Sequence, residues 1–481
     1  MEDTSLRQKT KKGLYWSFFN QFANYAMQFI VGIVMARLLT PSDYGITAIP
    51  VIFMAIANVF IESGFSSALV RKQELSEKDL TTSFLYSFGV GVFCYLCLFI
   101  CAPWIADFYD TPILKKLIRI TALTFLWAPL ITPQNVILQR KLDFKTPARI
   151  SIVNKIVSAI LGISAAYMGY GLWALVIANL SSSILGLIQT WLVVKWFPRE
   201  RWSRDSFKYL WGYGNKVVAS QLLDTFVSNL APFLIGKFGG GTVDLGNYNR
   251  AKGYAALPSS NVVSVLSTVT FPVLSKIQDD DEKLGLNYRK MIRVSAFLLF
   301  PIMLLLAALA RPLVLIMITA KWEACVILLQ LLCFTYIWQP IQILNVNLLY
   351  VKGRTDLALK LRMIIKPIGV MITIPTLIFG GIIWFCAAEI LMQIIALTMN
   401  TYYTGKLIKV GFFMQMKDIL PFFILSLLMF VLIIIINNYI VSLYLQVLFG
   451  GVFGILFYCG ISYLLRFEEL DEVKYLLNSK K

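Results

Sequence analysis

Long apolar stretches alternate with short polar segments from Leu14 almost to the C-terminus of this 481-residue chain. A helix needs about 20 apolar residues to cross the hydrocarbon core of a bilayer. By this criterion the pattern predicts fourteen spans, at residues 14–36, 44–70, 83–106, 113–132, 150–168, 172–194, 216–236, 251–275, 291–318, 324–350, 357–379, 381–404, 418–437 and 441–465. We therefore expect an all-α integral membrane protein with about fourteen transmembrane helices.

The composition agrees with this expectation. Hydrophobic residues make up 58% of the chain and charged residues 15%, whereas a typical soluble domain has about 45–50% apolar and about 25% charged residues. The net charge of +18 would indicate a nucleic-acid partner in a soluble protein. In a membrane protein, basic cytoplasmic loops explain the same charge, so we expect membrane lipids and no nucleic acid as partners.

The basic residues also predict an orientation. Of the 44 Lys and Arg residues, 34 lie in alternate segments that begin with the N-terminus, nine lie in the opposite segments, and Lys155 lies within a span. Cytoplasmic loops carry the excess of Lys and Arg in membrane proteins. Both termini are therefore expected in the cytoplasm, which requires an even number of spans.

An internal repeat divides the chain. Residues 36–45 read ARLLTPSDYG and residues 234–246 read LIGKFGGGTVDLG. Each segment has a basic residue, a turn of small residues, and then Asp-x-Gly opening the next span; Asp43 and Asp244 are read as turn or N-cap residues. Two halves that enter the membrane in the same orientation indicate parallel repeats with a binding site between them. We expect lobes of six helices at 1–200 and 201–410, and two more helices with a cytoplasmic tail at 411–481.

The sequence offers little for covalent catalysis. It has no His, no Walker A loop, no hydrolase nucleophile motif and no cluster of metal ligands. Cys94 and Cys97 form a C-x-x-C pair inside an apolar span, where buried cysteines are more typical than a metal or redox site. We therefore expect neither an enzyme nor a cofactor or metal site.

Several short motifs, in order, resemble those of one transporter family. They are ARLLTPSDYG at 36–45, ESGFSSALVR at 62–71, LQRKLDFK at 138–145, LIGK at 234–237, LGNYNRA at 245–251, FPVLSK at 271–276, NVNLL at 345–349 and VKGR at 351–354. The chain resembles the polysaccharide-transport (Wzx-like) flippases of the multidrug/oligosaccharidyl-lipid/polysaccharide exporter superfamily. Related sequences often carry an acidic residue shortly before LIGK, whereas this chain has Ala231 and Pro232 there.

The resemblance implies two six-helix bundles that face each other across a central cavity, with two appended helices. It implies an exporter of the bacterial cytoplasmic (inner) membrane that moves undecaprenyl-pyrophosphate-linked oligosaccharide to the periplasmic leaflet by alternating access. Such transport serves lipopolysaccharide O-antigen or capsule biosynthesis, with a polysaccharide polymerase and glycosyltransferases as partners.

Charged side chains inside spans are functional candidates, because each costs about 2.5–3.5 kcal/mol at the centre of a helix on insertion scales. We assign the cationic candidates to binding of the pyrophosphate anion; they are Lys155, Lys366, Arg250 and Lys252. The alternatives are snorkelling to the interface for the first two and an interfacial anchor for the last two. The acidic candidates for ion coupling are Asp224, Glu62 and Glu389; internal hydrogen bonds or ion pairs between helices are the alternative.

Polar amides are the candidates for contact with the sugars. Asn20, Asn24 and Gln28 share one helical face at a spacing of four residues, and Gln339 and Asn345 lie together in a later span. A cavity wall that faces sugars and a seam of hydrogen bonds between helices both produce this pattern.

Two other functions remain open at this point. A multidrug cation antiporter of the same superfamily would favour carboxylates and aromatic rings over cations in its cavity. An O-antigen polymerase or ligase would need a large ordered outer loop, and the longest outer gap, from Lys237 to Arg250, is short and rich in Gly.

Overall fold

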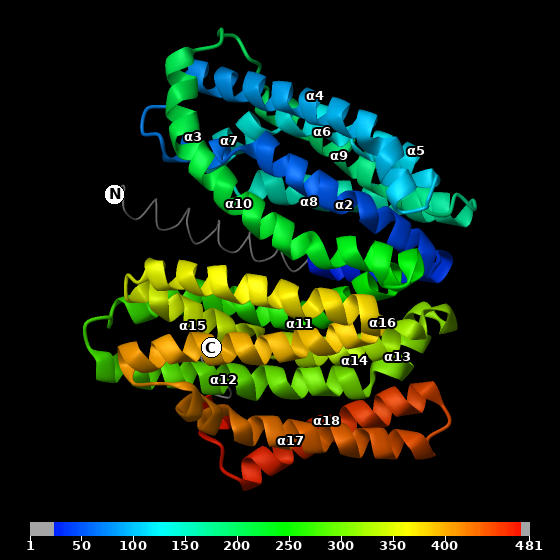
Figure 1. Cartoon of the computed structure of the whole chain (residues 1–481), viewed down its shortest axis with the longest axis vertical. Coiled ribbons are helices and arrows are strands. Elements are labelled where there is room, and N and C mark those ends of the chain that lie inside the picture. Colours follow the sequence, from blue (N-terminus) through cyan, green and yellow to red (C-terminus); the bar gives the residue numbers. More distant parts are fainter. Residues whose placement is uncertain (1–23, 473–481) are drawn as a thin grey trace. The chain divides into compact units, whose positions relative to one another are not determined.

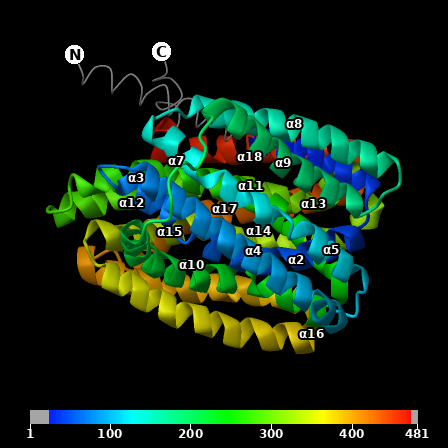
Figure 2. The ribbon, with the colours of Figure 1, turned by 90° about the horizontal axis from the view of Figure 1, so that it is seen from above.

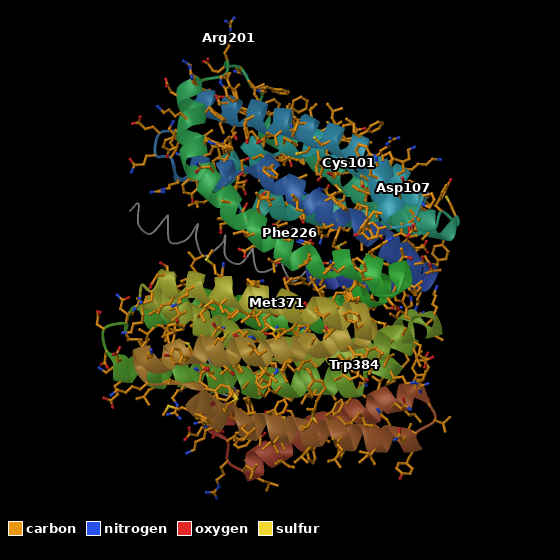
Figure 3. The ribbon with its side chains drawn as sticks, viewed as in Figure 1. Cys101, Asp107, Arg201, Phe226, Met371 and Trp384 are labelled. Carbon is orange, nitrogen blue, oxygen red and sulfur yellow. The ribbon has the colours of Figure 1, made fainter. Side chains whose placement is uncertain are left out.

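The computed structural model describes residues 24–472, and its regular structure is entirely helical within that range. Ten helices of the described chain are long and apolar enough to cross a membrane. Many large apolar side chains on them are exposed, including Phe226, Met371 and Trp384, which Figure 3 labels on their helices. Exposed apolar surface on this scale is expected where lipid is the solvent. The chain is therefore a multi-pass, all-helical membrane protein.

The chain divides into two compact units, Met1–Gly246 and Asn247–Lys481. The first unit contains the helix Asn24–Leu38 and the elements α2 (Pro41–Glu62), α3 (Phe65–Arg71), α4 (Glu77–Phe108), α5 (Ile113–Thr121), α6 (Thr124–Trp127), η1 (Ala128–Leu130), α7 (Thr132–Arg140), α8 (Lys145–Tyr167), α9 (Trp173–Val194), α10 (Arg204–Phe238) and the first turns of α11 (Gly241–Ser275). Within it α8 packs on α9, and α2 packs on both α4 and α10 (Figure 1).

Side-chain caps explain where two of these helices begin. The Thr40 hydroxyl accepts a hydrogen bond from the Asp43 backbone N–H at 3.3 Å, and Asp43 accepts one from the Thr40 N–H at 2.9 Å. Ser76 and Asp79 form the same capping box at the start of α4. Such reciprocal bonds satisfy backbone donors that have no partner inside the helix. Thr40 is the N-cap of α2, and Asp43, which was expected to be a turn or N-cap residue, is the third helical residue that completes the capping box. Asp244 lies in the first turn of α11.

The span expected at 44–70 is present as the candidate span Pro41–Arg71, and its helix is broken within the span. Ser63 and Gly64 have φ angles of 44° and 65°, in the left-handed region, and they separate α2 from α3. Helix α10 crosses this break closely: a Cβ atom added to Gly214 would lie 2.3 Å from the Ser63 carbonyl oxygen. The expected span at 113–132 is likewise divided, into α5, α6, η1 and the start of α7.

The second unit continues α11 and contains α12 (Asp281–Ala308), α13 (Ala310–Ile318), η2 (Ala320–Trp322), α14 (Ala324–Tyr336), α15 (Gln339–Val351), α16 (Thr355–Ile408), α17 (Phe412–Tyr439) and α18 (Leu443–Leu464). Gly381 interrupts the 54 residues of α16 with a φ of 75°, between the spans expected at 357–379 and 381–404. At about 1.5 Å per residue, 54 residues are more than twice the length that a bilayer core requires. Figure 2 shows this long element at the edge of its unit.

The last two helices pack against α12 of the second unit. The Arg289 guanidinium donates to both Asp418 carboxylate oxygens, at 2.7 and 2.6 Å. The Tyr458 hydroxyl donates to the Phe297 carbonyl oxygen at 3.0 Å, and the Phe297 ring meets that of Phe422 edge-on. An ion pair and an aromatic cluster therefore attach α17 and α18 to this unit.

We expect Arg289→Met to lower the free energy of unfolding by about 1.5–3 kcal/mol, because the Asp418 carboxylate loses a charged partner while it stays buried. Thermal unfolding of the purified protein in detergent measures the change. Arg354→Met is the control, since both members of the Arg354–Asp356 pair are exposed and such pairs contribute little. Equal unfolding temperatures for the two variants would contradict the prediction.

Candidate functional site

A polar pocket of about 240 Å³ lies among α7, α8 and α9 in the first unit. Its polar lining consists of Asn135, Ser151, Asn154, Lys155, Ser182 and Thr190. The volume is below the range of about 300–1,000 Å³ that is typical for drug-sized ligands. The pocket is therefore large enough only for a group smaller than a drug-sized ligand.

Lys155 provides the charge of this pocket. It is half-buried near the middle of α8, and it forms no ion pair with any residue of the described range 24–472. A lysine at this position in a membrane helix carries a large insertion cost. No acidic side chain of the described residues lines the pocket beside Lys155.

Two buried amides, Asn154 of the pocket on α8 and Gln134 of α7 outside the pocket lining, have polar atoms without described partners. Asn154 is 7% exposed, and its Oδ1 atom accepts no hydrogen bond within the described chain. Gln134, on α7, is fully buried, and both polar atoms of its side chain are without described partners. A buried polar atom that lacks a partner costs about 1–3 kcal/mol. A bound ligand or water that completes these hydrogen bonds would remove that cost.

Close packing of α8 on α9 forms the wall of the pocket. A Cβ atom on Gly186 would lie 3.0 Å from Asn154 Nδ2, and one on Gly162 would lie 2.7 Å from the Ala178 Cβ. Small residues at these positions let the two helices approach, as is usual between membrane helices. Gly186 thereby leaves space for the Asn154 amide at the pocket.

A second polar cluster lies within the second unit and joins α11 to α16. The buried Tyr248 hydroxyl donates to the Glu389 carboxylate, at 3.2 Å from Oε1 and 3.4 Å from Oε2. The Lys252 ammonium lies 5.7 Å from the centre of the Tyr248 ring, and its charge acts on Glu389. The structure thus brings together one cationic and one acidic candidate from the sequence analysis.

Arg250 has different surroundings from Lys252, although it lies only two residues away. Its guanidinium lies over the rings of Tyr254 and Trp322, 5.7 and 5.6 Å from their centres. Cation–π contacts of this kind stabilise an arginine in partly buried positions. Arg250 therefore packs among aromatic side chains of its own unit.

The remaining charged candidates are exposed on their units. Lys366 lies on α16, Asp224 on α10, and Glu62 is the final residue of α2, just before the Ser63–Gly64 break. The pattern placed Glu62 well inside the span expected at 44–70, and Glu62 lies within the candidate span Pro41–Arg71, beside the break in its helix. None of these three side chains lines the Lys155 pocket.

The amide candidates differ in their surroundings. Asn20 lies outside the described residues, Gln28 is exposed, and Asn24 accepts a hydrogen bond from Ser151 of the pocket at 3.2 Å. The Gln339 side-chain oxygen accepts a hydrogen bond from Ser259 at 2.9 Å, which joins α15 to α11. Gln339 thus takes part in interhelical hydrogen bonding, one of the two alternatives that its sequence pattern allowed.

Asn345 takes part in the same way and is fully buried. Its Nδ2 donates to Gln415 Oε1 at 3.0 Å, and its Oδ1 accepts from Gln415 Nε2 at 3.1 Å and from Thr404 at 3.3 Å. These bonds tie α15 to α16 and α17. Both ends of the Asn345 amide are therefore occupied by other helices in this structure.

The sequence analysis missed most of the Lys155 pocket. Asn135, Ser182 and Thr190 come from two helices on either side of α8, and a single sequence does not bring them together. One signal was present: Ser151, Asn154 and Ser158 recur every three or four residues in an apolar span and so share a helical face. That polar face of α8 includes the pocket.

The fold of the chain has a counterpart among solved membrane-protein structures. It is similar to the solved structure of the lipid II flippase MurJ in an inward closed conformation, with a TM-score of 0.74 and 17% sequence identity. The similarity covers 95% of this chain and 99% of that one. The expected superfamily fold is confirmed at this level.

Sequence comparison then gives the family. Residues 34–327 match the family described as "Polysaccharide biosynthesis protein", and the chain belongs to that family. It is 25% identical to the lipopolysaccharide biosynthesis protein WzxC of Escherichia coli (strain K12), over 78% of this chain and 76% of that protein. It is 26% identical to the teichuronic acid biosynthesis protein TuaB of Bacillus subtilis (strain 168), over 74% of each chain. The predicted resemblance to polysaccharide-transport proteins is confirmed.

Proposed function

We propose that this protein is a flippase that moves lipid-linked oligosaccharide across the bacterial cytoplasmic membrane for surface polysaccharide biosynthesis. The observation that carries the proposal is the Lys155 pocket: a polar, sugar-sized space with an uncompensated positive charge, among helices of a membrane protein. The relatives named for lipopolysaccharide and teichuronic acid biosynthesis support a glycan cargo.

The cargo that fits best is an oligosaccharide on undecaprenyl pyrophosphate. Its pyrophosphate needs cations, which Lys155, Lys366, Arg250 and Lys252 supply in this proposal, and its sugars need amides and hydroxyls. Movement by alternating access fits the proposed architecture of fourteen spans, with six-helix lobes at 1–200 and 201–410 and a further segment at 411–481 around a central cavity. In the proposed orientation both termini are cytoplasmic.

The charge of the pocket separates this proposal from a multidrug cation antiporter. A cationic drug would be repelled by Lys155, for which the described chain provides no acidic partner. A polymerase or ligase would act on the glycan after it has crossed the membrane. Loss of each of these three functions would therefore have a different effect on a cell that lacks the protein.

Deletion of the gene tests the proposal. We expect loss of surface polysaccharide, accumulation of the lipid-linked repeat unit in the inner leaflet, and unchanged resistance to cationic drugs. Single repeat units on the cell surface would indicate a polymerase instead, and drug sensitivity with normal glycan would indicate an antiporter. Either result would overturn the proposal.

The cluster of Tyr248, Lys252 and Glu389 is the site that we propose for ion coupling, since it holds a carboxylate between a hydroxyl donor and a cation. We expect Glu389→Gln to reduce gradient-driven transport about tenfold and to leave equilibration without a gradient unchanged, because only the ionisable group is lost. Transport into vesicles with and without a proton or sodium gradient measures this. Glu323→Gln is the control, since Glu323 is exposed beside Arg311; equal gradient dependence in both variants would contradict the coupling role.

A further inference from the structure

A second polar pocket, of about 620 Å³, lies at one end of the first unit between α3, the loop after it and α10. Figure 1 shows α3 beside the N-terminal half of α10. The pocket is lined by Ala68, Arg71, Lys72, Gln73, Glu74, Tyr209, Gly212 and Tyr213. None of these residues belongs to the Lys155 pocket or to the Glu389 cluster.

The pocket lies at the level where membrane helices meet water. Helix α3 ends at Arg71, and the apolar part of α10 begins at Val217, only a few residues beyond Tyr213. The first turns of α10 carry Arg204 and Lys208. Lipid phosphates occupy this level of a bilayer, and basic pockets there bind lipid head groups.

The two cations of the pocket differ in their availability. Lys72 is held by Asp79, with Nζ 2.8 and 2.7 Å from the carboxylate oxygens, and lies over the Tyr209 ring. Arg71 is exposed and lies 5.8 Å from the centre of the Tyr213 ring, and it forms no ion pair with a residue of the described chain. The guanidinium of Arg71 is therefore the group that is free to bind an anion.

Arg140 gives the loop around this pocket a fixed shape. Its guanidinium donates to the carbonyl oxygens of Leu69 at 3.0 Å and Gln73 at 2.8 Å, and also to those of Val70 and Lys72. These carbonyls belong to the last turn of α3 and the two residues after it, where helix acceptors lack internal partners. The Arg71 backbone is thus held in place before any ligand binds, and Arg140 is a positioning residue.

We propose that this pocket binds a phosphate group at the membrane surface. Arg71 supplies bidentate donors, which match phosphate geometry, and the Tyr209 and Tyr213 hydroxyls are further donors at the rim. Glu74 also lines the pocket and limits its net charge, which favours a single phosphate over a more highly charged group. The proposal depends on insertion of the chain in a bilayer and is independent of the transport proposed above.

Gly212 permits a test that leaves every charge in place. A Cβ atom at Gly212 would meet no other atom within 4 Å, so a larger side chain fits the fold and projects into the pocket. Gly89 on α4 is equally open and does not line the pocket. Gly212→Leu and Gly89→Leu are therefore a matched pair of variants.

The experiment uses the full-length protein in phosphatidylcholine nanodiscs and titrates farnesyl phosphate, with native mass spectrometry as the readout of bound probe. We expect one saturable site, at least tenfold weaker binding in Arg71→Gln and Gly212→Leu, and unchanged binding in Gly89→Leu. Competition by inorganic phosphate would assign the site to free phosphate, and no competition would assign it to the phosphate of a lipid. Equal binding in all variants would overturn the proposal, whether or not transport is observed.

Discussion

We expect Lys155→Met to lose transport while the folded protein becomes no less stable. Removal of an uncompensated charge from the middle of α8 removes an insertion cost of about 2.5–3.5 kcal/mol on insertion scales. The same change removes the one cation among the described residues that line the pocket, and one charge-assisted hydrogen bond to an anion contributes about 1.5–3 kcal/mol. Binding should therefore weaken by about ten- to a hundredfold.

Two measurements on each variant separate this outcome from a structural defect. Surface polysaccharide in a deletion strain reports transport, and thermal unfolding in detergent reports stability. Lys141→Met is the matched control, because Lys141 is exposed at the end of α7 and does not line the pocket. Transport at the wild-type level in Lys155→Met, or an equal loss in Lys141→Met, would remove the role assigned to the pocket.

We expect Gly45→Ala and Gly246→Ala each to abolish function and to lower stability. A Cβ atom on Gly45 would lie 1.6 Å from the Thr242 carbonyl oxygen, and one on Gly246 would lie 1.9 Å from the Pro41 carbonyl oxygen. The first turns of α2 and α11 are therefore in backbone contact, and Ser42 and Thr242 add a hydrogen bond at 3.1 Å. Because backbone atoms cannot move aside as side chains do, each alanine must separate the helices.

The expected loss of stability is at least the typical 1–3 kcal/mol that overpacking costs. The control is Gly253→Ala, further along α11, where an added Cβ atom would meet nothing within 4 Å. Alanine is favoured over glycine inside a helix, so this control should be neutral or slightly more stable. Unfolding temperatures of the three variants measure the effect, and a stable, active Gly246→Ala protein would contradict it.

The sequence predicted this contact between the first turns of α2 and α11 only in part. The repeat identified Asp-x-Gly at 43–45 and at 244–246 as equivalent, and the residue types indicated turns. It did not indicate that equivalent glycines pack together, because that contact joins residues about 200 positions apart. Periodicity along the chain describes one helix at a time, and the partner of a helix depends on the whole fold.

The helices themselves were largely predictable, since apolar length and Gly or Pro interruptions are local signals. The break at Gly381 falls where the pattern placed it. The break at Ser63 was not predicted, because it depends on Gly214 of α10, which packs on the Ser63 carbonyl. The cluster of Lys252, Tyr248 and Glu389 was missed for the same reason, since Tyr248, which contacts both charged residues, is an ordinary aromatic residue by sequence.

The chemical type of a residue indicated which side chains are unusual in an apolar span. It did not indicate what those side chains contact. Lys155 and Asn345 are both polar residues in apolar spans. Lys155 lines a pocket and has no ionic partner among residues 24–472, whereas Gln415 and Thr404 complete the hydrogen bonds of Asn345. Only the surrounding helices distinguish a side chain that awaits a ligand from one that holds helices together.

The central claim is that the protein carries a lipid-linked glycan from one leaflet to the other. Its most direct test reconstitutes the purified protein in liposomes with undecaprenyl-pyrophosphate-linked oligosaccharide confined to the inner leaflet, and measures how much becomes accessible to a lectin outside. We predict exposure that is rapid with the wild-type protein and slow with Lys155→Met. Exposure no faster than in protein-free liposomes, under every ion gradient, would contradict the account.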